Sequence, residues 1–430
     1  MRYSQDHFEV LRKIQKKPET TQRKLAEELG FSLGKLNYCL KALKEKGLIK
    51  TRNFKKNPNK INYFYVLTPQ GISEKTKLTI NFMKKKMGEY DELKKELSHN
   101  DVLEFKNEKL KYGFDGRLSK EFPSQVMVDL TEVCNLACIH CTHPEFKLST
   151  VYGKRMLDPK LNRKMIEEVS VFGKGITKYI RYTSNGEPLV HPKSYEMIQD
   201  AVENSGTKVT LTTNGTLLNE KRMFKILKTG LHMIDISTDA ASKETYKKIR
   251  VGGDLDTTQA NILKLLDLKK EANAKTKIIV SFVEQKENTH EVDDFKRYWE
   301  SKNVDEVLIR RLHSNSGSNL KDKIKTDTNQ NNRRPCLYPW ERVILNARGK
   351  LAFCPTDWYA KSELCSYEDH FIKDVWKNTF YKDLRNQHLT CKFSNKFCKQ
   401  CPDWKNTSWP FDQNKSYADL VERVLYKETS

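Results

Sequence analysis

The feature that most constrains the fold is an alternation of short apolar strands with amphipathic helices between residues 123 and 315. Strands that are each followed by a helix form parallel sheets. The fold class is therefore α/β, and the pattern predicts a partial (β/α)6 barrel, similar in plan to a TIM barrel, with its chemistry at the carboxyl ends of the strands. The predicted strands are QVMVDL, KYIRYTS, KVTLTTN, MIDIST, KIIVSFV and EVLIRRL.

The 10 cysteines of this 430-residue chain sit mostly in clusters. A large, Lys-rich chain keeps its thiols reduced in the cytosol, so clustered cysteines indicate metal binding rather than disulfides. The amino-terminal segment MRYSQDHFEV lacks the apolar stretch of a signal peptide. No apolar run approaches the roughly 20 residues that span a bilayer. We therefore expect a cytoplasmic protein without membrane insertion.

The segment VDLTEVCNLACIHC carries the first cluster, in which a predicted strand leads into a loop. Its three cysteines, Cys134, Cys138 and Cys141, follow a Cys-x3-Cys-x2-Cys spacing. Three thiolates can hold three irons of a 4Fe–4S cluster and leave one iron open for a small-molecule ligand. The alternative is a zinc ion held by the same thiolates together with His140 or His143.

This segment resembles the radical S-adenosylmethionine (radical SAM) superfamily. The resemblance implies that the amino and carboxylate groups of S-adenosylmethionine chelate the open iron. It also implies that reductive cleavage of the cofactor yields a 5′-deoxyadenosyl radical, which abstracts a hydrogen atom from the substrate. An electron donor such as flavodoxin or ferredoxin would supply the electron.

Further segments follow the family's order along the chain, although each of them alone could be an ordinary turn. A Gly-Glu-Pro core after the second strand resembles the motif that cradles the methionine amino group, with Asn185 in place of the usual glycine. Five further positions complete the resemblance. Asn214 lies at the end of the third strand, and Ser237 and Asp239 lie at the end of the fourth. Arg250 is a basic residue on the next helix, and His140 directly precedes the third cysteine. No general acid or base is predicted. The predicted cofactor-binding residues are His140, Asn185, Gly186, Glu187, Pro188, Asn214, Ser237, Asp239 and Arg250.

A second cysteine-rich segment, PCLYPWERVILNARGKLAFC followed by FCKQCPDW, resembles the SPASM extension of radical SAM enzymes. The resemblance implies one auxiliary 4Fe–4S cluster with the ligands Cys336, Cys354, Cys398 and Cys401. A hairpin turning at residues 347–350 would bring the first two together, and the cluster would replace a large core. With all four irons ligated, electron transfer is the expected role. The alternatives are a zinc knuckle and a substitute ligand, Cys391.

The amino-terminal segment predicts a winged helix: helices over residues 5–16, 21–29 and 32–46 precede a hairpin around Asn57-Pro58-Asn59. It resembles MarR-like regulators, and residues 1–100 carry 23 Lys and Arg against 11 Asp and Glu, a net charge of +12. In DNA-binding winged helices the third helix enters the major groove. A peptide leader and a second subunit are alternative partners. The predicted DNA contacts are Lys35, Asn37, Tyr38, Lys41 and Lys56.

The predicted domains are a winged helix (1–70), a helical linker or dimerisation segment (71–120), a radical SAM core (121–328), a SPASM-type domain (329–412) and a carboxyl-terminal helix (413–430). The helical segment 72–97 allows a homodimer.

Three functions are compatible with the sequence. The first is radical chemistry on a sugar-like or small hydroxylated substrate in surface-polysaccharide metabolism. The second is modification of a ribosomal peptide, and the third is a DNA-binding regulator whose clusters sense redox state. Arg311 and His313, near the end of the last strand, are possible pocket residues.

Overall fold

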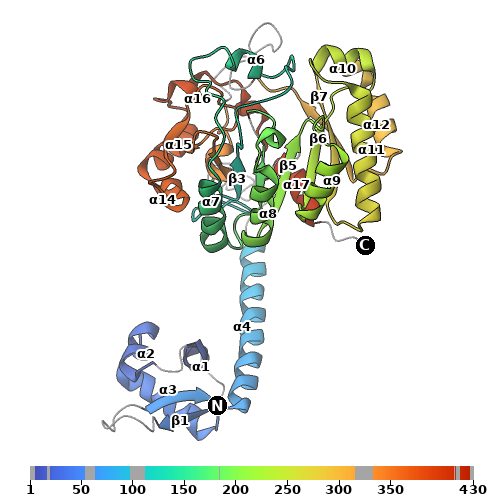
Figure 1. Ribbon diagram of the computed structural model, residues 1–430. Coiled ribbons are helices and arrows are strands. Elements are labelled where there is room, and N and C mark those ends of the chain that lie inside the picture. Colours follow the sequence, from blue (N-terminus) through green and yellow to red (C-terminus); the bar gives the residue numbers. More distant parts are fainter. Residues whose placement is uncertain are drawn as a thin grey trace. The chain divides into compact units, whose positions relative to one another are not determined.

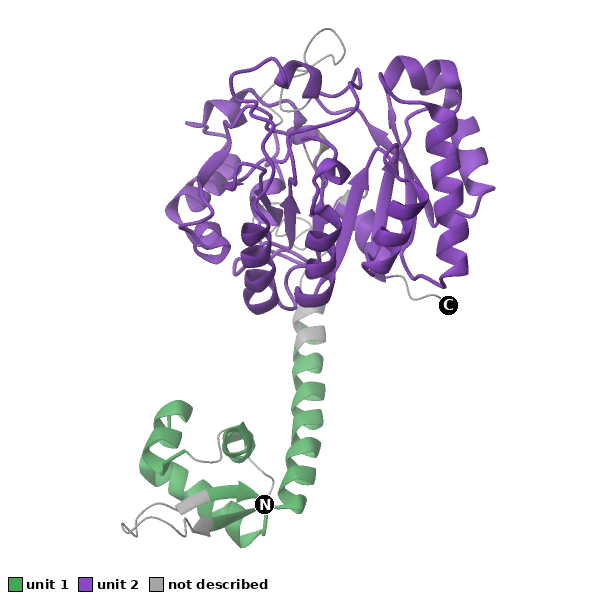
Figure 2. Cartoon of the chain, viewed as in Figure 1, with its two compact units in different colours: residues 1–109 green, residues 110–430 purple. Residues whose placement is uncertain are grey.

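The computed structural model describes residues 5–16, 20–53, 63–96, 112–183, 185–314, 333–410, 412 and 417–426. The chain forms two compact units, residues 1–109 and 110–430 (Figure 2). Within these described ranges, no helix has the length and apolar character needed to cross a membrane.

The smaller unit has the predicted winged-helix architecture. It contains helices α1 (Gln5–Lys16), α2 (Gln22–Leu29), α3 (Leu33–Glu45) and α4 (Pro69–Glu96), and an antiparallel pair of strands β1 (Ile49–Asn53) and β2 (Tyr63–Leu67). The hydroxyls of Thr21 and Ser32 accept backbone N–H groups at the starts of α2 and α3, as helix caps do. Leu36, Leu40 and Leu43 of α3 are buried in the core, as the helical spacing predicts.

The larger unit is built on a sheet of mainly parallel strands flanked by helices (Figure 1). All six predicted strands are present. They pair side by side in chain order: β3 (Gln125–Val128), β4 (Tyr179–Tyr182), β5 (Lys208–Thr213), β6 (Met233–Ser237), β7 (Lys277–Glu284) and β8 (Glu306–Arg311). Connecting helices are α7 (Pro159–Phe172), α8 (Ser194–Asn204), α9 (Glu220–Lys228), α10 (Lys243–Ile249), α11 (Leu255–Glu271) and α12 (Val292–Glu300). The predicted α/β fold class is confirmed.

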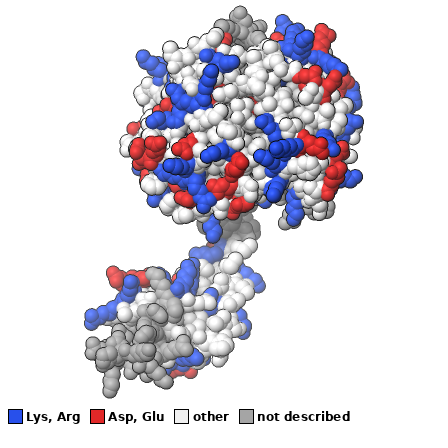
Figure 3. Space-filling view, viewed as in Figure 1, with Lys and Arg blue, Asp and Glu red and all other residues white. Residues whose placement is uncertain are grey.

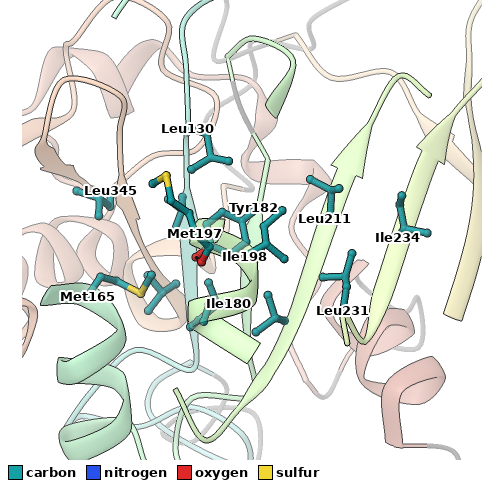
Figure 4. Close-up of a cluster of buried hydrophobic side chains, with 14 of the residues drawn as sticks. Leu130, Met165, Ile180, Tyr182, Met197, Ile198, Leu211, Leu231, Ile234 and Leu345 are labelled. Carbon is teal, nitrogen blue, oxygen red and sulfur yellow. Dashed lines mark hydrogen bonds between the residues drawn. The ribbon is translucent and has the colours of Figure 1, made fainter. Parts of the chain in front are cut away.

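Side chains alternate between the two faces of this sheet, as the pleat requires. Ile180, Tyr182, Leu211 and Ile234 face the helices and form the main core with residues such as Met165 of α7 (Figure 4). On the opposite face, Tyr179, Met233 and Ile279 pack against Ala418 and Val421 of helix α17 (Tyr417–Tyr426). The carboxyl-terminal helix therefore covers an apolar layer on the inner face of the strands.

The cysteine-rich segment extends the sheet beyond what the sequence predicts. Strand β9 (Arg342–Leu345) pairs in parallel with β3, and β10 (Lys350–Ala352) and β11 (Glu363–Ser366) continue the sheet in antiparallel fashion. The predicted hairpin is thus present between β9 and β10. Helices α13 (Tyr338–Glu341), α14 (Ile372–Lys377), α15 (Thr379–Thr390) and α16 (Lys396–Gln400) complete the segment.

The expectation that a metal cluster replaces a large core in this segment is wrong. Leu351, Tyr367, Trp376 and Tyr381 belong to the same hydrophobic core as the outer faces of β3 to β7. The physical reason is that β9 joins the edge of an existing sheet, so the segment buries its apolar side chains against that sheet. The division of residues 121–412 into two domains stays a prediction.

The remaining short helices are α6 (His143–Phe146), η1 (Pro188–Val190), η2 (Thr289–Glu291) and η4 (Asp403–Asn406). On the face of residues 110–430 seen in Figure 3, basic and acidic side chains are interspersed. The positive net charge of +22 is therefore not gathered into one patch on that face.

Candidate active site

The three cysteines of the first cluster lie on a loop between β3 and α6, at the carboxyl ends of the parallel strands. Backbone N–H groups of Ala137 and Ile139 donate to the carbonyls of Val251 and Ile249, at 2.9 and 3.0 Å, and attach the loop to the end of α10. Two N–H groups point at sulfur: Leu136 N lies 3.5 Å from Cys134 Sγ. His143 N lies 3.4 Å from Cys141 Sγ. Such donors stabilise thiolates.

The three thiols are close enough to influence each other's ionisation, since both Cys134 and Cys138 raise the pKa of Cys141. Burial is the larger cause, and it raises the pKa of Cys134 to about 11 and that of Cys141 to about 12. The free thiols are therefore neutral at pH 7, and a metal must displace their protons when it binds. Three converging thiols suit the three ligands of an open 4Fe–4S cluster.

No group of three or more His, Cys, Asp and Glu side chains within the described ranges forms a ready-made site for a metal ion. Both the iron–sulfur assignment and the zinc alternative therefore rest on the convergence of the thiols. His143 Nε2 lies 2.9 Å from the carbonyl oxygen of Glu132.

The Gly-Glu-Pro segment packs directly against the cysteine loop. A Cβ atom on Gly186 would lie 2.3 Å from the carbonyl oxygen of Val133, so only glycine fits there. The N–H of Glu187 donates to that same carbonyl at 2.8 Å. The Asn185 side chain instead donates to the carbonyl of Asp357 in the cysteine-rich segment, at 3.3 Å. Pro188 is buried at the start of η1.

Glu187 connects the ends of two strands. Its buried carboxylate accepts the hydroxyl of Thr213 at 2.6 Å and the backbone N–H of Asn214 at 2.8 Å. Burial raises the pKa of Glu187. The Asn214 amide in turn donates to Asn135 Oδ1 of the cysteine loop at 2.9 Å. Glu187 and Asn214 therefore hold the loop in place, whatever further contact they make with a cofactor.

Asp239 is the centre of a polar group beside the cysteines. It has a left-handed backbone, with φ of 61°, and its carboxylate accepts the N–H of Val283 at 2.7 Å. The same carboxylate pairs with the buried guanidinium of Arg250 and lies 3.6 Å from His140 Nε2. Ser237 lies two residues earlier, at the end of β6, and its hydroxyl accepts a hydrogen bond from Ser281 at 3.4 Å.

Sequence reasoning missed two residues that support this group. The amide of Asn288 donates to the carbonyl of Asp239 at 2.9 Å. The buried carboxylate of Glu132 accepts the N–H of Gly153 at 2.9 Å and the guanidinium of Arg348 at 2.8 Å, which connects the cysteine loop to the β9–β10 hairpin. The signal for Glu132 is its place in the strand-to-loop segment LTEVC; Asn288 has no recognisable motif.

A cavity of about 350 Å³ lies next to the cysteine loop. His140 and Thr183 line it on the side of the first cysteines, whereas Tyr338 and Thr356 line it on the side of the cysteine-rich segment. Arg311 and His313, noted in the sequence as possible pocket residues, do line this cavity.

The four cysteines Cys336, Cys354, Cys398 and Cys401 line one small cavity in the cysteine-rich segment. Tyr338 and Thr356 line this cavity as well as the larger one, and the Thr356 hydroxyl lies 3.3 Å from Cys354 Sγ. Burial raises the pKa of Cys336 and of Cys398, so their free thiols are also neutral. Four converging thiols fit the ligand set of a fully ligated 4Fe–4S cluster.

The other cysteines stand apart from this cavity. Cys391 is exposed and donates to the carbonyl of Arg333 at 3.3 Å, and it is absent from the cavity lining. Cys39 is buried in the winged-helix core, and Cys365 lies on β11. Sequence reasoning missed Arg333, whose guanidinium donates to the carbonyls of Cys398 and Lys399 at 2.6 and 3.0 Å.

In the smaller unit, Lys35, Asn37, Tyr38 and Lys41 are all exposed on α3. Lys35 pairs with Asp6 at 2.9 Å and lies over the ring of Phe31, so its charge is partly engaged within the unit. Lys56 lies outside the described residues.

Comparison with known proteins agrees with this geometry. Residues 128–296 match the radical SAM superfamily, and residues 7–50 match the family of winged helix-turn-helix DNA-binding domains. The chain is 33% identical over 141 residues to a probable GTP 3′,8-cyclase of Methanococcus maripaludis, covering 33% of this chain and 45% of that protein.

It is also 32% identical over 147 residues to an AdoMet-dependent heme synthase of Methanosarcina barkeri, covering 33% of this chain and 38% of that protein. The chain therefore matches less than half the length of these relatives. The structure of Streptococcus suis SuiB bound to its precursor peptide SuiA is 15% identical, covers 66% of this chain and 71% of that chain, and has a TM-score of 0.49.

Members of the matched superfamily use a 4Fe–4S cluster and S-adenosylmethionine. The match spans the strands and loops that carry Cys134, Glu187 and Asp239, while the amino-terminal match spans α1 to α3. The chain thus joins a segment that matches winged helix-turn-helix DNA-binding domains to a segment that matches the radical SAM superfamily.

Proposed function

We propose that this protein cleaves S-adenosylmethionine reductively and uses the resulting 5′-deoxyadenosyl radical to abstract a hydrogen atom from a substrate held in the 350 Å³ cavity. The observation that carries this proposal is the position of that cavity. His140, next to Cys141, lines one side of it, and Tyr338 and Thr356 separate it from the cavity of the second cysteine group.

Cys134, Cys138 and Cys141 would hold the cluster, which when bound supplies the electron that breaks a carbon–sulfur bond of the cofactor. The chain's own residues prepare the site. Glu187 and Asn214 hold the cysteine loop, and the Asp239–Arg250 pair fixes a buried charge beside Cys138. His140 lies within reach of both this pair and the cavity.

The second cysteine group would hold an auxiliary cluster through Cys336, Cys354, Cys398 and Cys401. Because four thiolates leave no open iron, this cluster would transfer electrons rather than bind the substrate. Its separation from the substrate cavity by Tyr338 and Thr356 supports that role.

The substrate we favour is a sugar-like or small hydroxylated compound, as in surface-polysaccharide metabolism. A cavity of about 350 Å³ accommodates a molecule of that size, near the lower end of ligand pockets. A peptide substrate, which would insert one side chain, is the second candidate.

The proposal is tested with anaerobically reconstituted protein, dithionite and S-adenosylmethionine, by following 5′-deoxyadenosine with mass spectrometry. Wild-type protein should form it, and Cys134→Ala should reduce its formation by at least about 1,000-fold, because one missing thiolate removes part of the cluster. The matched control is Cys365→Ala, which should behave as wild type. Wild-type rates in Cys134→Ala would overturn the mechanism.

We also propose that the winged helix binds DNA, because residues 7–50 match a DNA-binding family and Asn37, Tyr38 and Lys41 are exposed on α3. Selection from random DNA should yield a preferred sequence. Lys41→Ala should weaken binding to it and lower the salt slope by about 1, while Lys77→Ala on α4 should not. Failure to enrich any sequence would favour a peptide or a second subunit as the partner.

A further inference from the structure

We propose that the substrate is a phosphorylated small molecule, whose phosphoryl group is held by Arg181, Arg310 and Arg311 at the base of the 350 Å³ cavity. This inference deepens the proposed function and rests on it for the assignment of the cavity as the substrate site.

The alternation of side chains along the strands places the arginines on the inner face of the sheet. Tyr179, Met233 and Leu308 contribute to the apolar layer against α17. Two residues later on the same strands stand Arg181 and Asp235, and Arg310 follows Leu308 in the same way. Since side chains two positions apart face the same side of a sheet, the three charged groups lie directly above the apolar layer.

The contacts confirm that these residues form one group. Asp235 is completely buried, and its carboxylate pairs with Arg310 and lies 4.0 Å from the guanidinium of Arg181. Arg181 also donates to the hydroxyl of Thr212, at 3.1 and 3.2 Å. The side chains of Arg181 and Arg310 are 10% and 22% exposed, so both guanidinium groups are largely removed from water.

The charged side chains of this cavity wall are arginines. Arg181, Arg310 and Arg311 line the cavity, and the carboxylate of Asp235 lies beneath Arg181 and Arg310. Arg311 is exposed at the end of β8. A phosphate monoester carries about −1.5 to −2 charges at pH 7 and suits a wall of guanidinium groups.

A fourth arginine on the cavity wall is paired with a carboxylate of the protein itself. Arg342 also lines the cavity, but it donates two hydrogen bonds to Glu341 beside it. His313, on the same wall, has a lowered pKa, chiefly because it is buried; Asp403 opposes this shift, whereas Arg310 and Arg342 add to it by repelling a proton. No Asp or Glu side chain lines the cavity within the described ranges.

Largely buried guanidinium groups that line a cavity are stabilised when an anionic ligand binds there. Guanidinium groups are the side chains best suited to that anion, because they bind phosphate oxygens in pairs of parallel hydrogen bonds. The cofactor has a different cation available in Arg250, beside the cysteine loop. The arginines on β4 and β8 are therefore assigned to the substrate.

The test uses reconstituted protein saturated with S-adenosylmethionine, so that the cofactor's own carboxylate is already bound. Calorimetry measures the dissociation constants of inorganic pyrophosphate, a sugar monophosphate, a nucleoside diphosphate and an acidic peptide. Phosphorylated probes should bind, and Arg310→Gln should raise their dissociation constants at least tenfold. Arg311→Gln, at an exposed position, should raise them at least threefold and serves as the second variant if Arg310→Gln does not fold.

The matched control is Arg297→Gln on α12, whose exposed guanidinium pairs with Asp294 outside the cavity; it should leave binding unchanged. A second readout is phenylglyoxal modification mapped by mass spectrometry, in which pyrophosphate should protect Arg181 and Arg310 but not Arg297. Absence of binding, binding of the acidic peptide alone, or equal binding by wild type and both variants would overturn the inference.

The outcome is separable from that of the proposed function. Formation of 5′-deoxyadenosine without any anion binding would leave the radical chemistry intact and remove only the phosphorylated substrate. Anion binding without 5′-deoxyadenosine would support the anion site and contradict the radical mechanism.

Discussion

The two cysteine groups of the larger unit are built in opposite ways. Cys134, Cys138 and Cys141 lie within one loop, whereas the second group comes from three separate stretches: Cys336 precedes α13, Cys354 follows β10, and Cys398 and Cys401 belong to α16 and its carboxyl-terminal cap. The first group supplies three thiols and the second four. An open cluster thus needs only a local loop at the ends of the strands, while a closed one requires the tertiary structure to enclose it.

The two cysteine groups also differ in the contacts that hold them in place. The loop is held by backbone contacts to α10 and by the close approach of Gly186 to Val133. The second group depends on the β9–β10 hairpin and on α16, which join the main hydrophobic core through residues such as Leu345 and Cys398. Substitutions should therefore affect the two groups separately.

The largest effect confined to one cysteine group is expected from Cys398→Ala. Loss of one of four ligands should remove the auxiliary cluster, so that the iron content falls from about eight to about four per chain. Cleavage of S-adenosylmethionine without substrate should continue, because the first cysteine group is intact. Iron and sulfide analysis with an assay of 5′-deoxyadenosine measures both effects. Unchanged iron content would contradict the assignment of Cys398.

A smaller effect is expected from Gly186→Ala, which directs a Cβ atom at the carbonyl of Val133. The loop must shift, and the free energy of unfolding should fall by about 1–3 kcal/mol, with weaker cofactor binding. Urea denaturation and calorimetry with S-adenosylmethionine measure the two quantities. The control is Gly88→Ala on α4, where an added Cβ atom would meet nothing within 4 Å beyond its chain neighbours and its own helical turn. Equal stability and affinity in both variants would rule out the close packing.

A pH-dependent effect is expected at Asp129, where β3 meets β9. Its N–H donates to Leu345 at 2.8 Å, and burial raises the pKa of its carboxyl group to about 7. Because this pKa exceeds the ordinary value near 4, the folded protein keeps a proton that the unfolded chain releases. The free energy of unfolding that the protonated Asp129 contributes is present at low pH and is lost as the pH rises through about 7.

Asp129→Asn removes this titration. Relative to wild type, the variant should therefore gain free energy of unfolding between pH 5 and pH 8, by an amount on the order of a few kcal/mol. Urea denaturation at both pH values measures the change. A constant difference between the two proteins would show that Asp129 does not titrate in this range.

The smallest effect is expected from Cys391→Ala, since Cys391 is exposed and does not line the cavity of the second group. Iron content and 5′-deoxyadenosine formation should match those of wild type. A loss of iron comparable to that in Cys398→Ala would instead make Cys391 a ligand.

The sequence predicted those features that are set by residues close together in the chain. The strands β3 to β8 follow from short apolar runs, and the winged helix follows from caps such as Thr21 and Ser32. The cysteine loop was recognised for the same reason, because its spacing lies within a few residues.

What the sequence did not predict depends on contacts between distant segments. The pairing of β9 with β3 and the contact of Arg348 with Glu132 join residues more than 200 positions apart. The charged layer of Arg181 and Asp235 was missed although its signal is local: each stands at an inward position within an otherwise apolar strand. Weighing that signal would have indicated an anion site.

The central claim is that the first cluster has an open iron and the second does not. Electron paramagnetic resonance of reduced Cys398→Ala, which should retain only the first cluster, and of Cys134→Ala, which should retain only the second, tests it directly. Adding S-adenosylmethionine should change the spectrum of Cys398→Ala and leave that of Cys134→Ala unaltered. A cofactor-dependent change in Cys134→Ala, or none in Cys398→Ala, would contradict the account.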